Sequence, residues 1–389
     1  MTFLLLTVIY IAFIGLGVPD SLFGAAWPAI QSGFGFSLDS ANYITMTVSG
    51  CTVISSMLGA RLVKKAGTAI VTAVSAAMVA VGLLCFSYCD SIVLMCLCAV
   101  LLGLGAGATD ASLNNYIALH YSAKHMNFLH CFYGVGVMTS PYIMSLLLVR
   151  SGWQQGYRTV FLIQGAIALI LFLSLPLWKK VRHKDPVQTE DHTQTKILPY
   201  SQMVKDPAIR LDWLMCIAIN VLEGVGGLWG SAYLVYALNL SPSKAAGSIT
   251  LFYVGMALGR FLSGLAADKI SSWRIIKICM VITAGGIGLM FVPVPAMAVV
   301  GLFFLGLGVG PIYPNIMHLT PKHFGGDVSA SIMGSQMATA YFGIMIGPPI
   351  FGLIAENVTA ALFPVYLIVW LAAFTVASTL FRRKVKITQ

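Results

Sequence analysis

Long apolar segments make up most of this 389-residue chain. They run for about 20 residues or more, which is the length an α-helix needs to cross the hydrocarbon core of a bilayer. Only 9% of the residues are charged, against about 25% in an ordinary soluble domain. The segments are continuously apolar, whereas the strands of a membrane barrel alternate apolar and polar residues. We therefore predict an all-α membrane protein with 12 transmembrane helices, over residues 3–31, 41–60, 68–88, 92–120, 126–149, 158–178, 211–238, 245–267, 275–293, 296–319, 327–355 and 360–381.

Basic residues gather on one side of this predicted array, because most of them follow every second segment. Cytoplasmic loops carry an excess of Lys and Arg, so we expect both termini and the central loop to be cytoplasmic, in a plasma membrane such as the bacterial inner membrane. The asymmetry accounts for the net charge of +10, and no nucleic-acid partner is needed to explain it. The residues concerned are Arg61, Lys64, Lys65, Lys124, Lys179, Lys180, Arg182, Lys184, Lys269, Arg274, Lys277, Lys322, Arg382, Arg383, Lys384 and Lys386.

A polar segment, Lys179–Asp206, divides the predicted spans into six and six, and the two sets repeat one another. The fourth span contains LGLGAG from Leu102, and the tenth contains LGLGVG from Leu305. A repeat of equal orientation predicts two pseudo-symmetric six-helix bundles, which is a transporter architecture with its substrate site at the bundle interface. We expect a monomer with a first bundle at 1–178, a cytoplasmic linker loop at 179–210, a second bundle at 211–381 and a basic tail at 382–389.

Four ionisable residues fall deep inside predicted spans: Asp20, Asp110, His130 and Glu223. A charged side chain at mid-bilayer depth costs about 2.5–3.5 kcal/mol even on a lenient scale, so such a residue is a functional candidate by default. Desolvation brings carboxyl and imidazole groups closer to exchanging protons near neutral pH. We expect Asp20, Asp110 and Glu223 to couple transport to protons. The structural alternatives are a hydrogen-bonded Asp110 in a glycine-rich helix and a Glu223 that only partners a basic residue.

Helical spacing places polar or aromatic neighbours beside these residues, since positions three, four and seven apart share a face. Trp27 follows Asp20 in this way, Asn114 follows Asp110, and Tyr133 follows His130. Carboxylates, amides and an aromatic ring face are suited to a polyol such as a sugar. The alternatives are an interfacial anchor for Trp27 and interhelical hydrogen bonding for the amides. The candidate substrate-binding residues are Asp20, Trp27, Asn114, His130, Tyr133, Asn220, Glu223, Trp229, Tyr313, Asn315, Gln336 and Thr339.

Arg260 and Asp268 lie eight residues apart on the eighth span and its exit, and we expect them to gate transport as a cytoplasmic interlock. The alternative for Arg260 is a side chain that reaches out to the interface. The eight cysteines lie mostly inside predicted spans without zinc-ligand spacing. We therefore expect no metal and no cofactor. No pairing of a nucleophile with a base is visible in the sequence, so we also expect no catalytic residue and no enzyme.

Several motifs resemble those of the major facilitator superfamily, across the whole chain. Gly264-Leu-Ala-Ala-Asp268-Lys269 is similar to the superfamily's signature loop, although the first-half copy from Gly59 to Gly67 lacks the acid. Asp20, Asp110 in GLGAGATDASLNNYI and the segment Gly310–Asn315 resemble the fucose–galactose–glucose proton symporter branch. The chain departs from that branch by having Pro19 before the first acid and Asp rather than Glu in the fourth span.

The resemblance implies a secondary active transporter that works by alternating access and imports a hexose or a related small polar metabolite with protons. One alternative is a proton-driven exporter of drugs or amphiphilic metabolites, which the GxxxGP stretch from Gly343 and the 18 methionines favour. Another is a receptor on the transporter fold that binds a ligand without transporting it. The expected partners are a small sugar-like substrate, protons and the lipid bilayer.

Overall fold

The computed structural model describes residues 2–36, 40–148, 151–184, 196–240 and 242–388. Over these residues it is helical with no strands, and it contains 12 helical segments that are long and apolar enough to cross a membrane. This confirms the prediction of an all-α protein with 12 spans. Residues 185–195 of the predicted linker lie outside the described part of the chain.

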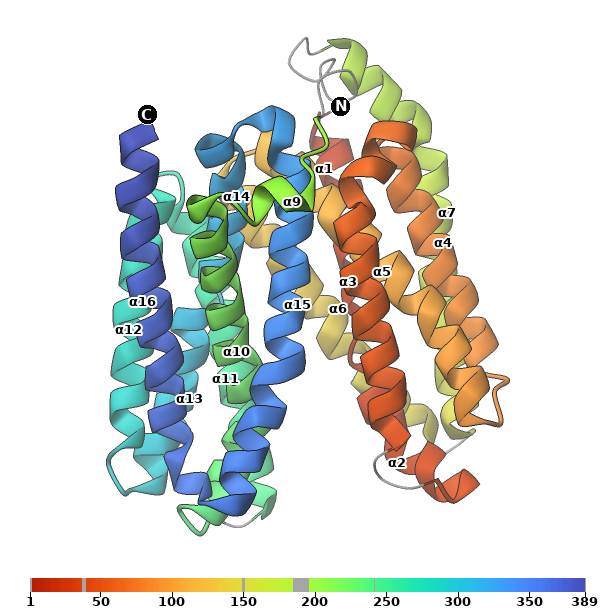
Figure 1. Ribbon diagram of the computed structural model, residues 1–389. Coiled ribbons are helices and arrows are strands. Elements are labelled where there is room, and N and C mark those ends of the chain that lie inside the picture. The colour runs from red at the N-terminus through yellow and green to blue at the C-terminus, as the bar shows by residue number, and fades with distance from the viewer. Residues whose placement is uncertain (1, 37–39, 149–150, 185–195, 241, 389) are drawn as a thin grey trace. The chain divides into compact units, whose positions relative to one another are not determined.

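Figure 1 shows the order of the helices along the chain. Those of the first half are α1 (Thr2–Gly17), α2 (Leu22–Phe34), α3 (Ser40–Ala66), α4 (Thr68–Phe86), α5 (Ile92–His120), α6 (Ala123–Leu148) and α7 (Gly152–Lys184). Those of the second half are α9 (Tyr200–Met203), α10 (Pro207–Tyr236), α11 (Pro242–Ala266), α12 (Ser272–Met290), α13 (Pro295–Val309), α14 (Ile312–Phe324), α15 (Gly326–Asn357), the 3₁₀ turn η1 (Ala360–Leu362) and α16 (Phe363–Thr388).

Two of the predicted spans are interrupted helices. The first breaks at 18–21, around Pro19 and Asp20, and the tenth breaks at Gly310 and Pro311. Proline lacks a backbone N–H and its ring crowds the preceding turn, so a helix tends to stop where it occurs. The spans predicted at 3–31 and 296–319 are therefore each built from two helical segments. In a membrane such breaks are tolerated only where protein or a water-filled space covers the exposed backbone.

The chain forms two compact units. Unit 1 comprises Met1–His120, Leu129–Ile197 and Gly326–Gly334, and unit 2 comprises Tyr121–Phe128, Leu198–Gly325 and Ser335–Gln389. Each unit is therefore built mainly from one half of the sequence. The beginning of α6 nevertheless belongs to unit 2, and the beginning of α15 belongs to unit 1.

The repeated glycine runs have a packing role in both units. In α5 of unit 1, a Cβ added to Gly103 would collide with the backbone of α3 at Val48, and one added to Gly105 would meet the backbone of α4 at Ser75. In α13 of unit 2, Gly306 and Gly308 lie in the same way against the backbones of α11 and α12, at Phe252 and Cys279. Alternate glycines thus let one central helix approach two neighbours closely, which explains why LGLGAG and LGLGVG recur.

Candidate functional site

The polar residues of unit 1 converge on one face of α6. His130 and Tyr133 lie three residues apart on this helix and so point to the same side. His130 reaches α5, and Tyr133 reaches the break between α1 and α2. Both acids predicted in the first half therefore connect to the same short stretch of α6.

The first connection runs from α6 to Asp110. The Nε2 atom of His130 lies 3.2 Å from Oδ1 of Asn114. Asn114 Nδ2 in turn donates to Oδ1 of Asp110 at 2.8 Å and to the Asp110 carbonyl at 2.9 Å. All three side chains are buried, and the ring of Phe13 packs edge-on against His130. This order of bonds makes His130 the donor to the amide oxygen, which fixes its proton on Nε2.

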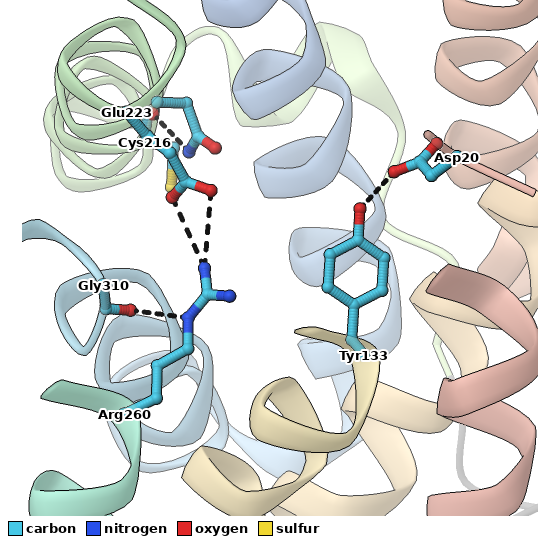
Figure 2. A network of polar contacts seen from close by, with 7 residues as sticks. Asp20, Tyr133, Cys216, Glu223, Arg260 and Gly310 are labelled. Carbon is cyan, nitrogen blue, oxygen red and sulfur yellow. Dashed lines mark hydrogen bonds and ion pairs between the residues drawn. The ribbon is translucent and has the colours of Figure 1, made fainter. Parts of the chain in front are cut away.

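The second connection runs from α6 to Asp20. The hydroxyl of Tyr133 donates to Oδ2 of Asp20, and Figure 2 shows the phenol aimed directly at the carboxylate. Asp20 is exposed although it interrupts an otherwise apolar span, because the helix break turns its side chain away from the core. No ion pair to Asp20 is found among the described residues. The hydrogen-bond partner of Asp20 is thus the neutral hydroxyl of Tyr133.

The helix break is fastened to α6 at further points. Ser21 Oγ donates to the carbonyl of Val137 at 2.5 Å and lies 2.9 Å from Ser140 Oγ. Gly17 and Gly136 make the crossing close enough for this, because a Cβ on either one would collide with the backbone of the other helix. The geometry around Asp20 is therefore set by a tight, glycine-dependent contact between α1 and α6.

The acid of unit 2 has a different environment. Glu223 on α10 lies opposite Arg260 on α11, whose Nη2 is 3.4 Å from Oε1 and 3.5 Å from Oε2 (Figure 2). Arg260 Nε also donates to the carbonyl of Gly310 at 3.1 Å. Gly310 is the last residue before Pro311, so this carbonyl is freed by the break between α13 and α14. The guanidinium therefore satisfies both a carboxylate and a broken helix end.

A second polar cluster in unit 2 surrounds Asn315, which is fully buried on α14. Its Nδ2 donates to the Pro311 carbonyl at 2.8 Å and to Ser263 Oγ at 3.0 Å, with Asn127 Oδ1 at 3.5 Å. Its Oδ1 has no hydrogen-bond partner among the described residues. Asn127 is one of the α6 residues that belong to unit 2, and the sequence analysis had not selected it.

Gln336 on α15 leads to an acid that sequence reasoning missed. Its Nε2 donates to Oδ2 of Asp212 at 2.7 Å, and its Oε1 accepts from Thr320 at 2.9 Å. Asp212 is 2% exposed. It lies next to the start of the predicted span 211–238, where an acid suggests a solvated helix end. The helix begins earlier, at Pro207, and this places Asp212 inside it.

Four further predicted residues bond elsewhere or pack in the core, and a fifth, Tyr313, is buried on α14. Trp27 is 8% exposed and packs in the hydrophobic core of unit 1, where its ring contacts Phe23. Trp229 donates to the carbonyl of Pro348 at 2.9 Å. Asn220 and Thr339 bond to carbonyls of their own helices, and Tyr313 is buried.

The two predicted gating residues do not pair with each other. Arg260 is 6% exposed and bonds Glu223, as described above, so it does not reach out to the interface. Asp268 forms an ion pair of 3.1 Å with Lys124, which lies at the start of α6 and also belongs to unit 2. The ion pair of Asp268 with Lys124 thus joins two segments that are far apart in the sequence. The described residues contain no group of His, Cys, Asp or Glu side chains that could hold a metal ion.

Two known proteins are similar to this chain in sequence. The chain is 24% identical to "Bypass of stop codon protein 6" of Saccharomyces cerevisiae, with 97% of this chain and 82% of the relative covered. It is 20% identical to the "Glucose/mannose transporter GlcP" of Bacillus subtilis, with 64% of each covered.

Solved structures share the fold at low identity. The E. coli fucose:proton symporter FucP superposes with a TM-score of 0.72 at 15% identity, covering 96% of this chain and 98% of that one. The proton:xylose symporter XylE superposes with a TM-score of 0.76 at 12% identity, covering 95% and 94%. The family model described as "Major Facilitator Superfamily" matches residues 9–231 and 216–387. Twelve apolar helices and a match over nearly the whole chain establish that this protein is a transporter of the major facilitator superfamily, and not an enzyme.

Proposed function

We propose that this transporter imports a sugar, or a similar small polar metabolite, together with protons. The observation that carries the proposal is the pair of connections made by α6, from His130 through Asn114 to Asp110 and from Tyr133 to Asp20. The names of the similar proteins agree with it, since FucP and XylE are described as sugar:proton symporters and GlcP as a glucose/mannose transporter.

The proton step centres on Asp20. An ionised carboxylate accepts a charge-assisted hydrogen bond from Tyr133, and such bonds are roughly twice as strong as neutral ones. Protonation of Asp20 removes the charge and weakens this bond, which loosens the α1–α2 break from α6. A ligand shifts a conformational equilibrium only by its differential affinity for the two states. Proton binding would supply that difference.

Uncharged groups around the acids favour an uncharged substrate. Asn114, His130 and Tyr133 offer an amide, an imidazole and a phenol, which can donate to and accept from sugar hydroxyls. A few convergent polar groups of this kind, set among apolar residues, are typical of small-molecule sites. Trp27 is not included in the proposed site because its ring is buried in the core.

The test is uptake of labelled fucose, xylose, glucose and mannose by proteoliposomes, with and without an inward proton gradient. We expect one or more of these sugars to accumulate, and the accumulation to collapse when a protonophore is added. Asp20→Asn and Asp110→Asn should lose the coupling, while Asp90→Asn, an exposed acid in the turn after α4, serves as the control.

Undiminished proton-coupled uptake in both site variants would refute the proposal. If no sugar is taken up in response to the gradient, the assay is repeated with cationic lipophilic compounds, whose extrusion would identify an exporter. Saturable binding without flux would identify a receptor.

We also propose that both termini are cytoplasmic, in a plasma membrane such as the bacterial inner membrane, on the strength of the Lys and Arg asymmetry. A reporter that fluoresces only in the cytoplasm, fused after Gln389, should be bright. A dark but stable fusion would reverse the orientation.

A further inference from the structure

A cleft in unit 2 that the transport proposal does not use lies between α12 and α16. These helices contact one another and lie side by side in Figure 1. The cleft has a volume of about 440 Å³. The α12 side is formed by Trp273, Ile276, Lys277 and Met280, whose spacing puts them on one face of the helix.

The α16 side carries further cations at the same end. It is lined by Thr375, Ser378, Thr379, Arg382 and Arg383, again on one helix face. The cleft therefore holds three positive side chains and no acid among its lining residues. None of the three forms an ion pair with another described residue. Three uncompensated cations in one cleft favour an anionic ligand.

The ring of Trp273 positions one of the cations at the charged end of the cleft. The guanidinium of Arg382 lies over the ring of Trp273, 5.4 Å from its centroid. Trp273 is itself held in place, because its Nε1 donates to Nε2 of His323 on α14 at 3.2 Å. The hydroxyls of Ser378 and Thr379 donate to the Thr375 carbonyl on their own helix. The donors free to meet an anion are therefore those of Lys277, Arg382 and Arg383.

The other end of the cleft has no charged lining residue, since it is formed by Met280 on α12 and by Thr375 on α16, whose hydroxyl donates to the Leu371 carbonyl of its own helix. Met280 lies two turns deeper along α12 than Trp273, which is about 10 Å at 1.5 Å per residue. The neighbouring outer surfaces are those of a lipid-facing wall, since Val281 is 72% exposed and Val376 58% exposed on these apolar helices. A cleft with cations at one end and an uncharged, lipid-facing end two turns away matches the polarity of a phospholipid better than that of a free anion.

We propose that this cleft binds an anionic phospholipid, with the headgroup phosphate at Lys277, Arg382 and Arg383 and the upper acyl chain along Ile276 and Met280. Basic residues at a membrane surface attract anionic lipid with a gain of roughly fivefold in affinity for each Lys or Arg. The inference is independent of which substrate is transported.

Quenching of Trp273 fluorescence by brominated lipid tests this in nanodiscs. The lipids are phosphatidylglycerol and phosphatidylcholine, each brominated near the headgroup end of its acyl chains. The Trp273 signal is the difference between the wild type and Trp273→Phe, because the chain has seven tryptophans. We expect brominated phosphatidylglycerol to quench this signal at much lower mole fraction than brominated phosphatidylcholine.

The triple variant Lys277→Gln/Arg382→Gln/Arg383→Gln should lose the preference, and Lys277→Gln alone should reduce it by about fivefold. The single variant keeps the test decisive if the triple variant is unstable. The matched control is Arg61→Gln/Lys64→Gln/Lys65→Gln, which removes three exposed cations at the end of α3. This control should keep the preference.

Equal quenching by the two lipids in the wild type would overturn the proposal, and so would a preference that survives in the triple variant. Inorganic phosphate is added in a parallel series at constant ionic strength. If phosphate displaces the lipid at millimolar concentration, the site is one for soluble anions and the lipid assignment fails. Persistence of the lipid preference in phosphate supports it.

Discussion

Asp20 in unit 1 and Glu223 in unit 2 are both acids inside apolar spans, yet they have opposite kinds of partner. Asp20 is exposed and accepts a hydrogen bond from the neutral hydroxyl of Tyr133. Glu223 faces the guanidinium of Arg260, which also bonds a free helix-end carbonyl. Protonating an acid that is paired with a cation costs free energy, because the cation is then left without a compensating charge. An acid held by a neutral donor can gain and lose a proton more easily.

The comparison divides the acids that looked alike in sequence. Under the proposed function, it favours unit 1 as the place where protons would bind, and we propose a structural role for Glu223, whose partner Arg260 bonds the carbonyl at the break between α13 and α14. The symmetry of the repeat is therefore a symmetry of packing, seen in the glycine runs of α5 and α13, and it does not extend to the ionisable groups.

The largest effect on uptake should come from replacing Asp20, and Glu223 provides the comparison. Asp20→Asn is expected to abolish gradient-driven accumulation, a loss of about a hundredfold or more, which is the factor that a positioned acid or base typically contributes to a proton-transfer step. Glu223→Gln should lower the amount of folded protein but leave the remaining uptake dependent on the gradient. Uptake in proteoliposomes, normalised to reconstituted protein, measures both. Gradient dependence that disappears only in Glu223→Gln would reverse the comparison.

Removing the cation should have the next largest effect. Arg260→Gln leaves Glu223 without its charge partner, which costs about 1.5–3 kcal/mol, the range for a hydrogen bond to a charged group, because Glu223 is 26% exposed and the pair is only partly buried. The double variant Arg260→Gln/Glu223→Gln removes both charges and should recover part of the loss. Unfolding temperatures in detergent rank the stability of the wild type, Arg260→Gln and the double variant. A double variant less stable than Arg260→Gln would show that the ion pair between Arg260 and Glu223 does not account for the loss of stability.

Tight helix crossings can be tested in both units with one type of substitution. Gly136→Ala in α6 forces apart a backbone contact with α1 and should cost about 1–3 kcal/mol. Gly343→Ala in α15 is expected to cost less, because its added Cβ would lie 2.8 Å from the Ile217 carbonyl on α10, whereas the one on Gly136 would overlap its neighbour. Gly134→Ala is the control, since nothing lies within 4 Å of its added Cβ. Equal unfolding temperatures for the Gly134 and Gly136 variants would contradict this account of the crossing.

The smallest effect concerns the hydroxyl beside Asp20. Tyr133→Phe removes one hydrogen bond to a charged group, worth at least about 1.5 kcal/mol. That corresponds to roughly a tenfold change, so we expect uptake to fall by this factor while staying dependent on the proton gradient. The rate of uptake over a range of external pH measures the change. A Tyr133→Phe variant as inactive as Asp20→Asn would mean that the phenol takes part in proton transfer itself.

Twelve spans and an all-α fold followed from the sequence because long apolar runs have one stable form in lipid, in which each helix satisfies its own backbone. Pairing within a helix was also predictable: Asn114 was placed beside Asp110 by spacing alone, and the structure confirms their contact. The same reasoning could not identify Tyr133 as the partner of Asp20, because that contact depends on how α6 crosses the break between α1 and α2.

The tertiary structure alone decided which ionisable groups meet. Arg260 and Asp268 looked like one interlock, yet they pair with Glu223 and Lys124, because neighbouring helices in the fold supply the nearer opposite charge. Trp27 looked suited to a sugar ring, but it lies in the core of unit 1. Asp212 escaped notice because its helix starts earlier than the hydropathy pattern indicated. The length of the apolar runs determines which segments cross the membrane, whereas the partners of the few polar groups depend on helix packing, which hydropathy does not encode.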